Sequence, residues 1–531
     1  MYRVIEEEST LLYVDEGTMM SLSLMLCWTS MHLSHQMLYS SPNNSYGIVL
    51  RFTERGLAYA VNIAIYKEVP KWKWTKIINV SISNVNETAD GVNYWIDKLI
   101  LNTKPKEPKE GIPNSFSVTI DPTLRCLKVT ALDAFASLRG KVQCHNLTGD
   151  EKQNCSVIVK TPWSFRVNID RDKDGYLMSH MCNSTDKCAI PSSDPALYPT
   201  IEFSNCTRSE KKVCARGKST FEELFIEHRL NETLNGLKKE ACVLIEKFVN
   251  KNLTMLLRNK IDLIPNINKT FTIDLLMPKK PLYNESYIDT FHKGTVSWYT
   301  TDEIYKTTPI SNYDLPYNNR MLYLWASGDT IKAFLEGFQI HGNLHQKITA
   351  EDLKNGGLNT TCQTGVCVGR LVPLLAEKYP NHYIDLDLYS LETPDVKFEQ
   401  NLAVIKGKIV MFAYVRDPVQ KHDIETIGIA KLNGKVSMQI KLWVNGSTLH
   451  AVVDAIDPYL ENIDSSISDF NVQTVNFIIR SAVIVTVEPL LNEFGKTGFG
   501  IPVAHVELYN STIELRKDII LIGSDLVHIE K

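Results

Sequence analysis

Lysine and tryptophan residues alternate in the segment around residue 70. Lys71, Lys73 and Lys76 stand beside Trp72 and Trp74, and Lys67 precedes them. Lysine attracts anionic lipid headgroups, and tryptophan is stable at the interface between a membrane and water. The same alternation also fits an amphipathic strand whose tryptophans are buried and whose lysines are solvated. We predict that four lysines contact anionic headgroups: Lys67, Lys71, Lys73 and Lys76.

Motifs for catalysis and for metal binding are missing from the sequence. It contains no G-x-S-x-G, H-E-x-x-H, G-x-G-x-x-G or P-loop pattern. Residues 170–175 match the first six positions of an EF-hand loop, but Met181 occupies the twelfth position, where calcium needs a bidentate glutamate. A polar hairpin turn is the better interpretation. The sequence predicts no enzyme and no metal site, with a secreted hydrolase of unrecognised motif as the alternative.

Acceptor sequences for N-glycosylation are unusually frequent. The chain has 14 N-x-[ST] sequences, whereas its 37 Asn and 73 Ser and Thr residues would give about 5 by chance. Because this sequence is used only in the secretory route, the surplus predicts a secreted glycoprotein. Nine of these asparagines are our candidate glycosylation sites: Asn79, Asn86, Asn146, Asn183, Asn231, Asn252, Asn284, Asn359 and Asn445.

The first 41 residues read as an extension followed by a signal peptide. Residues 1–18 carry five acidic residues, unlike the basic start of a signal peptide, whereas an apolar stretch begins at Met20. We therefore expect translation to start at Met19 or Met20 and cleavage to fall between Ser34 and Ser41.

The cysteine count fits an oxidising compartment. Of 11 cysteines, Cys27 lies within the expected signal peptide, and the remaining ten allow up to five disulfides. Cys362 and Cys367 are far from the others in the sequence and are expected to pair with each other. The cysteines and histidines do not have the spacing that a zinc site requires. The remaining eight cannot be paired from spacing alone: Cys126, Cys144, Cys155, Cys182, Cys188, Cys206, Cys214 and Cys242.

Composition and charge indicate two domains. The 531 residues are 44% hydrophobic and carry a net charge of −4, which argues against a dedicated nucleic-acid binder. Residues 44–300 contain 36 basic and 28 acidic residues, whereas residues 301–531 contain 20 and 28. No run of about 18 apolar residues predicts a transmembrane helix.

Hydrophobic periodicity predicts the same order of elements in both halves. A helix after Thr53, as N-cap, carries Leu57, Ala60 and Val61 on one face. A long helix with a capping box at Thr220 and Glu223 presents an apolar stripe as far as Phe248. Residues 300–320 read as a linker. Helix-like segments follow at 331–338 and 374–379, strands dominate 382–488, and a last helix lies near 488–494.

Five segments resemble, in order, the lipid-binding serum glycoproteins. This is the family of bactericidal/permeability-increasing protein, lipopolysaccharide-binding protein, and the phospholipid and cholesteryl ester transfer proteins. GIVLRFTERGLAYA (47–60) resembles the opening strand and helix of the family, and PTIEFSNC (199–206) with Cys242 resembles its disulfide. RMLYLWAS (320–327) and VPLLAEKYP (372–380) resemble parts of its C-terminal domain. The closing pattern is the most specific match: Asn492, GFGIP (498–502), VELYN (506–510) and ILIGSDL (520–526).

The resemblance implies an α+β fold shaped as a boomerang. Two similar barrels, each a twisted antiparallel sheet wrapped on a long helix, are joined by a central sheet. The implied domains are a basic lipid-binding barrel at 43–299, the linker at 300–320 and an acidic lipid-binding barrel at 321–531. The resemblance also implies a disulfide between Cys206 and Cys242 and apolar pockets for phospholipid-like molecules. Our candidate pocket residues are Leu57, Val61, Leu234, Leu237, Leu244 and Phe248.

The function implied is that of a secreted lipid-binding protein without a cofactor. Its expected partners are phospholipids and the surface of a membrane or lipid particle, contacted peripherally. Lipopolysaccharide or other anionic microbial lipids are candidate ligands, in innate defence. The lysine-rich tip of the lipopolysaccharide binders is only half present, because the second expected basic loop offers just Arg125 and Lys128. The alternative is a phospholipid or neutral-lipid transfer protein without microbial recognition.

Overall fold

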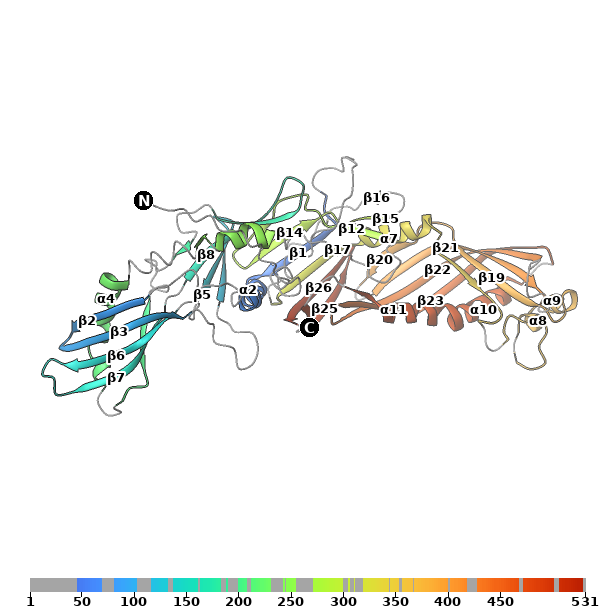
Figure 1. Ribbon diagram of the computed structural model, residues 1–531. Coiled ribbons are helices and arrows are strands. Elements are labelled where there is room, and N and C mark those ends of the chain that lie inside the picture. Colours follow the sequence, from blue (N-terminus) through green and yellow to red (C-terminus); the bar gives the residue numbers. More distant parts are fainter. Residues whose placement is uncertain are drawn as a thin grey trace, which may run out of the picture.

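The protein is elongated, with sheets arranged one after another along its length (Figure 1). The computed structural model describes residues 45–68, 81–102, 116–131, 137–160, 163–182, 188–189, 199–207, 212–230, 242–243, 245–254, 271–298, 304–305, 310, 319–342, 344–352, 356–365, 367–399, 402–417, 427–467, 471–500 and 506–528. None of the helices in these ranges combines the length and hydropathy that crossing a bilayer requires.

A central antiparallel sheet is present, as the resemblance implies, and it contains strands from both ends of the described chain. Its order is β13-β14-β1-β17-β26-β25. β1, from the start of the described chain, lies between β14 and β17, and β17 in turn pairs with β26 near the C-terminus. The strands are β1 (Ile48–Thr53), β13 (Leu282–Tyr283), β14 (Tyr287–His292), β17 (Leu322–Ser327), β25 (Val506–Arg516) and β26 (Ile519–His528).

The central sheet is buried on both faces. Ile48, Leu50 and Phe52 of β1 join the largest hydrophobic cluster, whereas Val49 joins a second cluster on the opposite face. Arg51 shares the face of Val49 because side chains alternate along a strand. Its guanidinium makes two hydrogen bonds, of 2.7 and 2.8 Å, to the carboxylate of Asp289, and both side chains are fully buried. The paired geometry offsets the cost of burying the two charges.

The N-terminal half divides its strands between two sheets rather than wrapping one sheet on one helix. The first has the order β10-β8-β5-β4, with β9 on β8, and packs near α2 (Glu54–Glu68) and the π-helix η5 (Phe248–Leu253). A short sheet, β12-β15-β16, packs against α7 (Gly328–Ile340) of the C-terminal half. The strands are β4 (Phe116–Asp121), β5 (Cys126–Ala131), β8 (Trp163–Arg171), β9 (Leu177–Met181), β10 (Cys188–Ala189), β12 (Phe271–Asp274), β15 (Thr295–Trp298) and β16 (Ile304–Tyr305).

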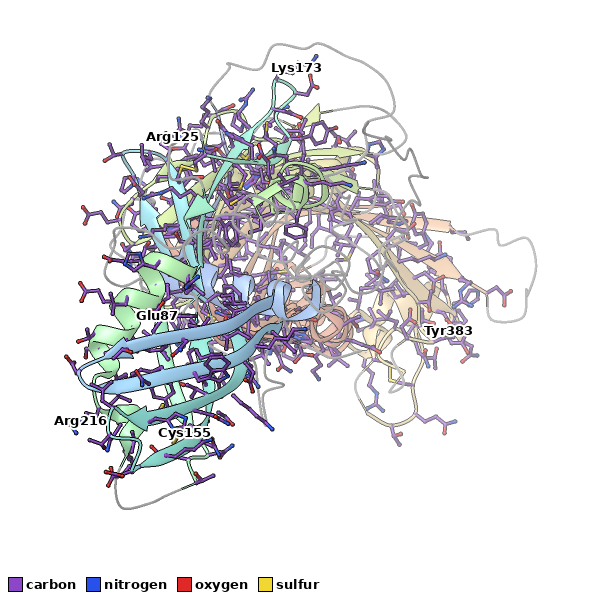
Figure 2. The ribbon with its side chains drawn as sticks, turned by 60° about the vertical axis from the view of Figure 1, so that its left-hand side comes forward. Glu87, Arg125, Cys155, Lys173, Arg216 and Tyr383 are labelled. Atoms are coloured by element: carbon purple, nitrogen blue, oxygen red, sulfur yellow. A yellow bond between two sulfur atoms is a disulfide. The ribbon has the colours of Figure 1, made fainter. Side chains whose placement is uncertain are left out.

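The second N-terminal sheet forms a separate lobe at one end of the molecule, which we call the tip lobe (Figures 1 and 2). Its order is β11-β7-β6-β3-β2, and helices cover one face. It has its own hydrophobic core, separate from the cluster around the central sheet. The elements are β2 (Ser81–Ala89), β3 (Val92–Asn102), β6 (Ser137–Asn146), β7 (Lys152–Lys160), β11 (Thr200–Ser204), η3 (Val213–Ala215), α4 (Lys218–Phe225) and η4 (Ile226–Leu230).

Two predicted helix starts have different outcomes. Thr53 caps α2 as predicted, because its hydroxyl oxygen accepts a hydrogen bond from the Gly56 amide at 3.3 Å. The capping box at Thr220 is wrong: α4 begins at Lys218, and the Thr220 hydroxyl instead donates to Asp90 at 2.8 Å. The N-cap is Gly217, with φ of 67°, where a Cβ atom would lie 2.6 Å from the Ala89 carbonyl oxygen. Only glycine suits that close approach.

The C-terminal half is one seven-stranded sheet covered by helices. The order is β18-β19-β21-β22-β23-β24, with β20 on β21. The strands are β18 (His345–Ile348), β19 (Tyr383–Ser390), β20 (Asp395–Glu399), β21 (Leu402–Arg416), β22 (Ile427–Asn445), β23 (Thr448–Ser465) and β24 (Phe499–Gly500). The helices are α7 (Gly328–Ile340), α8 (Val368–Leu371), α9 (Pro373–Lys378), α10 (Val472–Ala482), the π-helix η6 (Val483–Val487) and α11 (Glu488–Thr497).

The α+β fold of antiparallel sheets joined by a central sheet is confirmed, and three details of the architecture go beyond the expectation. In the described strands no sheet closes on itself, and only the N-terminal half divides its strands between two large sheets. The linker at 300–320 contains β16, which pairs with β15, and Ile310, which is buried against the central sheet. The last helix is also far longer than predicted, because α10, η6 and α11 run without a break from Val472 to Thr497.

Candidate functional site

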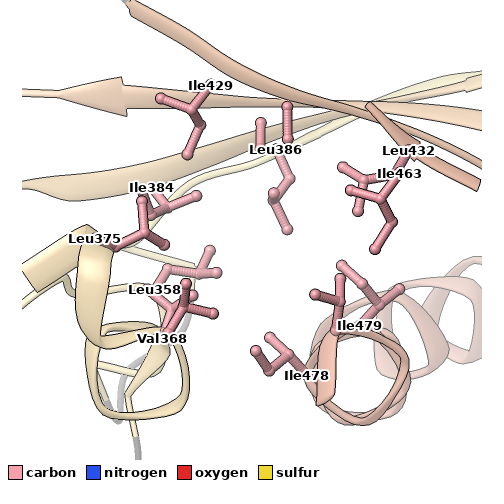
Figure 3. Close-up of a pocket in the computed structure, with 14 residues that line it drawn as sticks. Leu358, Val368, Leu375, Ile384, Leu386, Ile429, Leu432, Ile463, Ile478 and Ile479 are labelled. Carbon is pink, nitrogen blue, oxygen red and sulfur yellow. The ribbon is translucent and has the colours of Figure 1, made fainter. Parts of the chain in front are cut away.

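An apolar cavity lies between the seven-stranded sheet and its helices in the C-terminal half (Figure 3). Residues of α8 and α9 line one side, residues of α10 another, and inward-facing residues of β19, β21, β22 and β23 the rest. All of the lining side chains are apolar: Leu358, Val368, Val372, Leu375, Ile384, Leu386, Ala413, Ile429, Ala430, Leu432, Ile463, Val475, Ile478 and Ile479.

The cavity is small in this conformation. Its volume is about 50 Å³, which exceeds the roughly 10–15 Å³ that one water needs but falls well short of the ~300 Å³ of a typical ligand site. An acyl chain therefore fits only if the helices move apart. A cavity without hydrogen-bonding groups favours hydrocarbon over water.

Asparagine side chains fasten the long helix to the sheet. Asn471 caps α10, because its side-chain oxygen accepts from the amides of Gln473 and Thr474 at 2.9 and 3.2 Å. Asn476 accepts a hydrogen bond from the Leu460 amide, and Asn492 accepts one from the Val453 amide, both at 2.7 Å. Both amides lie where the pairing of β22 with β23 shifts register, so the asparagines satisfy donors beside irregularities of the ladder.

The helices α8 and α9, on the other side of the cavity, are held by a local disulfide. Cys362 and Cys367 are bonded to each other, as predicted from their isolation in the sequence. Gly369 packs so closely on the backbone of Thr360 that a Cβ atom would lie 1.6 Å from the Thr360 carbonyl oxygen. This wall is therefore more constrained than the wall formed by α10.

One charged cluster of this half lies on the outer face of the sheet, away from the cavity. Ile384 and Leu386 of β19 face the cavity, so Asp385 between them faces outward. The Asp385 carboxylate accepts a hydrogen bond of 2.8 Å from Arg416, which also binds Glu351. The hydrogen bond from Arg416 lowers the pKa of the Glu351 carboxyl, and both carboxylates raise the pKa of the Arg416 guanidinium.

The predicted pocket residues lie in the other half. Leu57 and Val61 of α2 are buried in the cluster around the central sheet, and half-buried Phe248 packs against the same cluster. The amide of Asn62 docks α2 on β4, donating to the Phe116 carbonyl and accepting from the Phe116 amide, at 2.8 and 2.9 Å. Three predicted pocket residues lie outside the described residues: Leu234, Leu237 and Leu244.

The disulfide implied between Cys206 and Cys242 is wrong. Cys206 is bonded to Cys155, which lies on the neighbouring strand β7. Cys206 packs against the core of the tip lobe, whereas Cys242, also disulfide-bonded but to another residue, packs against the central cluster. Because the two cysteines belong to different cores, they cannot pair. Two further disulfides join Cys126 to Cys182 and Cys144 to Cys214.

The predicted headgroup contacts cannot be placed. Lys71, Lys73 and Lys76 lie outside the described residues, and only the backbone of Lys67, near the end of α2, is described. The polar hairpin turn expected near residue 172 is present between β8 and β9, where Asp172 accepts from the amides of Asp174 and Tyr176 at 2.9 Å.

The candidate glycosylation sites differ in exposure. Asn86, Asn284 and Asn445 are exposed, and Asn146 and Asn359 are half-buried. The side-chain amide of Asn146 donates to Glu151 at 3.0 Å. Four sites lie where no side chain is described: Asn79, Asn183, Asn231 and Asn252.

The comparisons with known proteins agree with this architecture. Residues 265–528 match the LBP / BPI / CETP family, C-terminal domain. The bactericidal permeability-increasing protein of Sebastes schlegelii is 23% identical over 487 residues, covering 90% of this chain and 95% of that protein. The lipopolysaccharide-binding protein of Mus musculus is 21% identical over 355 residues, covering 63% of this chain and 69% of that protein.

A solved structure shares the fold. The crystal structure of lipopolysaccharide binding protein has a TM-score of 0.51 and 18% identity, covering 92% of this chain and 100% of that chain. Residues 265–528 thus belong to the LBP/BPI/CETP family as its C-terminal domain. The similarity to bactericidal permeability-increasing protein and lipopolysaccharide-binding protein covers 90% and 63% of the chain.

Proposed function

We propose that this protein is a secreted, non-enzymatic protein that holds phospholipid-like molecules in apolar pockets. The observation that carries the proposal is the cavity of the C-terminal half, whose 14 lining residues are all apolar. Each CH₂ group moved from water into such a site gains ~0.8 kcal/mol, so the favourable free energy of binding grows with the length of the acyl chain that enters.

Lipid analysis of the purified protein tests this function. The protein is secreted from cultured animal cells, extracted with organic solvent, and its lipids are identified by mass spectrometry. We expect phospholipid-like molecules in the parent protein and less of them in Ala413→Leu, which narrows the cavity. Ala455→Leu is the matched control, because Ala455 is exposed on the outer face of the same sheet. A parent protein free of lipid would contradict the proposal.

We further propose that the ligands include anionic microbial lipids. Two observations support this: one relative is named for binding lipopolysaccharide and another for bactericidal permeability increase, and residues 44–300 contain 36 basic against 28 acidic residues. Lysine side chains near an anionic surface contribute about 1 kcal/mol each, screened by salt.

Serine substitution of Lys67, Lys71, Lys73 and Lys76 tests microbial recognition. Binding to lipopolysaccharide should fall strongly at low salt and little at ~1 M salt, where the Debye length is only ~3 Å. Binding to phosphatidylcholine vesicles should change little. If the quadruple variant binds lipopolysaccharide as the parent does, these lysines do not recognise microbial lipids, and a lipid transfer protein without that recognition is the better description.

Passage through the secretory route is tested by the exposed acceptors. Asn86→Gln and Asn445→Gln should each remove one glycan from the secreted protein. Each loss should appear as a single step in gel mobility towards that of the parent treated with glycosidase. A secreted parent without glycans would contradict the glycoprotein part of the proposal.

A further inference from the structure

The helix that walls the cavity is apolar on the side that faces away from it. From Val472 to Val487 the sequence VQTVNFIIRSAVIVTV contains a single charged residue, Arg480. A helix that is apolar all round is normally surrounded by a protein core or by lipid. Here α10 and η6 bury only the side that packs on the sheet, through Val475, Ile479 and Val483.

Four apolar residues form a stripe along the exposed side of α10 and η6, which we call the outer stripe: Phe477, Ile478, Ile484 and Val485. Residues seven apart share one side of a helix, which relates Phe477 to Ile484 and Ile478 to Val485. Phe477, Ile484 and Val485 are 60%, 43% and 54% exposed. Scattered exposed apolar residues are ordinary, whereas several side by side mark an interaction surface.

Two polar groups beside the outer stripe, on Ser481 and Arg480, have partners. The Ser481 hydroxyl lies between Phe477 and Val485 along the helix and donates to the Phe477 carbonyl at 2.8 Å. Arg480, at the edge of the stripe, lies 3.4 Å from the carboxylate of Asp457. The outer stripe therefore enters an apolar medium without leaving the Ser481 donor unsatisfied.

The outer stripe is continuous with the cavity through Ile478. This half-buried residue belongs to the stripe and also lines the cavity, which is partly open to solvent. Figure 3 shows Ile478 on α10 and Val368 on α8 at the side of the cavity opposite the sheet residues Ile429 and Leu386. A hydrocarbon chain passing from Phe477 to the cavity would meet apolar side chains throughout.

The charge of this half indicates which lipid surface fits. Residues 301–531 contain 20 basic and 28 acidic residues, and the one cation of the segment is paired with Asp457. The net negative charge of this half would repel anionic headgroups. An electrically neutral, zwitterionic phospholipid surface is the complementary partner.

We propose that the outer stripe of α10 and η6 docks on a zwitterionic phospholipid surface and that acyl chains enter the cavity beside Ile478. This proposal rests on the proposed lipid-binding function and names the surface through which lipid is exchanged. Because the contact is apolar, docking should be insensitive to salt, unlike any binding through the lysines near residue 70.

A triple substitution tests the docking surface: Phe477→Ser, Ile484→Ser and Val485→Ser in the full chain. Co-sedimentation with phosphatidylcholine vesicles should fall at least tenfold, at both 0.1 M and 1 M salt. The matched control changes three apolar residues of similar exposure elsewhere, Ile340→Ser, Leu147→Ser and Val527→Ser, which are 55%, 65% and 44% exposed. This control should bind within about twofold of the parent. Phe477→Ser alone should weaken vesicle binding several-fold, and this milder variant keeps the test valid if the triple variant misfolds. Near-ultraviolet circular dichroism checks the folding of both variants.

The outcomes separate this proposal from the function on which it rests. If the parent retains lipid but the triple variant binds vesicles as well as the parent or the control does, the docking surface is wrong and lipid binding stands. If the parent neither retains lipid nor binds vesicles, both fail. If the triple variant only converts a dimer into monomers, measured by sedimentation velocity, the stripe is a contact between copies of this chain and the proposal is wrong.

Discussion

The tip lobe and the C-terminal half both cover one face of an antiparallel sheet with helices, but they fill the space between differently. In the tip lobe, the ring of Tyr94 on β3 stacks on that of Phe221 on α4, with ring centres 4.1 Å apart, and Phe221 lies 5.5 Å from Phe225 of the same helix. In the C-terminal half the facing side chains are aliphatic and leave a cavity of about 50 Å³.

The disulfides also differ between the tip lobe and the C-terminal half. Two disulfides, Cys144–Cys214 and Cys155–Cys206, close loops of 70 and 51 residues around the tip lobe. In the C-terminal half, the disulfide Cys362–Cys367 spans five residues and leaves α10 without a covalent tie to the sheet. Burial, with Asp90 and Glu222 nearby, raises the pKa of the Tyr94 hydroxyl to about 12, as expected in a filled core. A filled, cross-linked lobe suits rigidity, whereas an aliphatic, loosely tied one suits exchange of a ligand.

Removing a long-range disulfide should have the largest effect and should be confined to the tip lobe. Cys144→Ser with Cys214→Ser frees a 70-residue loop, which costs roughly 4 kcal/mol by loop-closure entropy, a model-dependent figure. Hydrogen exchange followed by mass spectrometry should report faster exchange in β3 and β6.

The disulfide of the C-terminal half provides the control. Cys362→Ser with Cys367→Ser frees a loop of only five residues, which costs roughly 2 kcal/mol on the same basis, and exchange in the tip lobe should stay unchanged. If either pair of substitutions accelerated hydrogen exchange equally in the tip lobe and in the C-terminal half, the contrast between a cross-linked tip lobe and a loosely tied C-terminal half would be wrong.

Acid should weaken the central sheet before it weakens the two regions that flank it. His292 of β14 is fully buried, and burial lowers the pKa of its imidazole to about 4, against smaller opposing effects of the Leu275 carbonyl and Asp274. Its Nδ1 donates to the Leu275 carbonyl at 2.7 Å, so the neutral ring accepts from Thr290 through Nε2 at 2.9 Å. The unfolded chain binds a proton near pH 6.5, whereas the folded chain binds it only near pH 4. Stability is therefore complete above pH 6.5 and falls by about 3 kcal/mol on going to pH 4.

Urea unfolding monitored by hydrogen exchange at pH 7, 5 and 4 measures this loss. Among the described residues, His292 is the one buried histidine, so the tip lobe should keep its own exchange protection across this range. His292→Gln retains a donor and an acceptor but does not titrate, and should remove most of the dependence. An unchanged pH profile in that variant would assign the acid sensitivity to other groups.

Much of the fold could be predicted because its signals are local or ordered. Thr53 and the alternation Ile48, Leu50 and Phe52 specify the first strand and helix, and the closing pattern specifies the last strands. The division of the N-terminal strands into two sheets could not be predicted, because strand pairing depends on contacts between residues distant in the sequence. The cysteine pairing failed for the same reason, since Cys206 is placed beside Cys155 by the pairing of β11 with β7.

The candidate site was missed because of one misread segment. Val475, Ile479 and Val483 belong to a run rich in β-branched residues, which predicts strand by propensity. In the structure this run forms α10 and η6, because its inward residues pack on the concave side of the seven-stranded sheet, and tertiary packing overrides propensity. The spacing of Val475, Ile479, Ala482 and Val483 was the available signal for a helix.

A pair of equal substitutions tests whether one lobe is filled and the other hollow. Ala89 is buried in the core of the tip lobe, and Ala413 is buried beside the cavity. Ala89→Leu inserts three carbon atoms into this buried core and should destabilise the tip lobe by about 1–3 kcal/mol. Ala413→Leu places the same atoms in the cavity, where gained contacts offset strain, so stability should change by less than about 1 kcal/mol. Chemical denaturation of the lipid-free proteins measures both, since bound lipid would add its own stabilisation. Equal destabilisation by the two leucines would mean that the C-terminal cavity is as tightly closed as the core of the tip lobe, and that α10 does not yield to a new side chain or to an acyl chain.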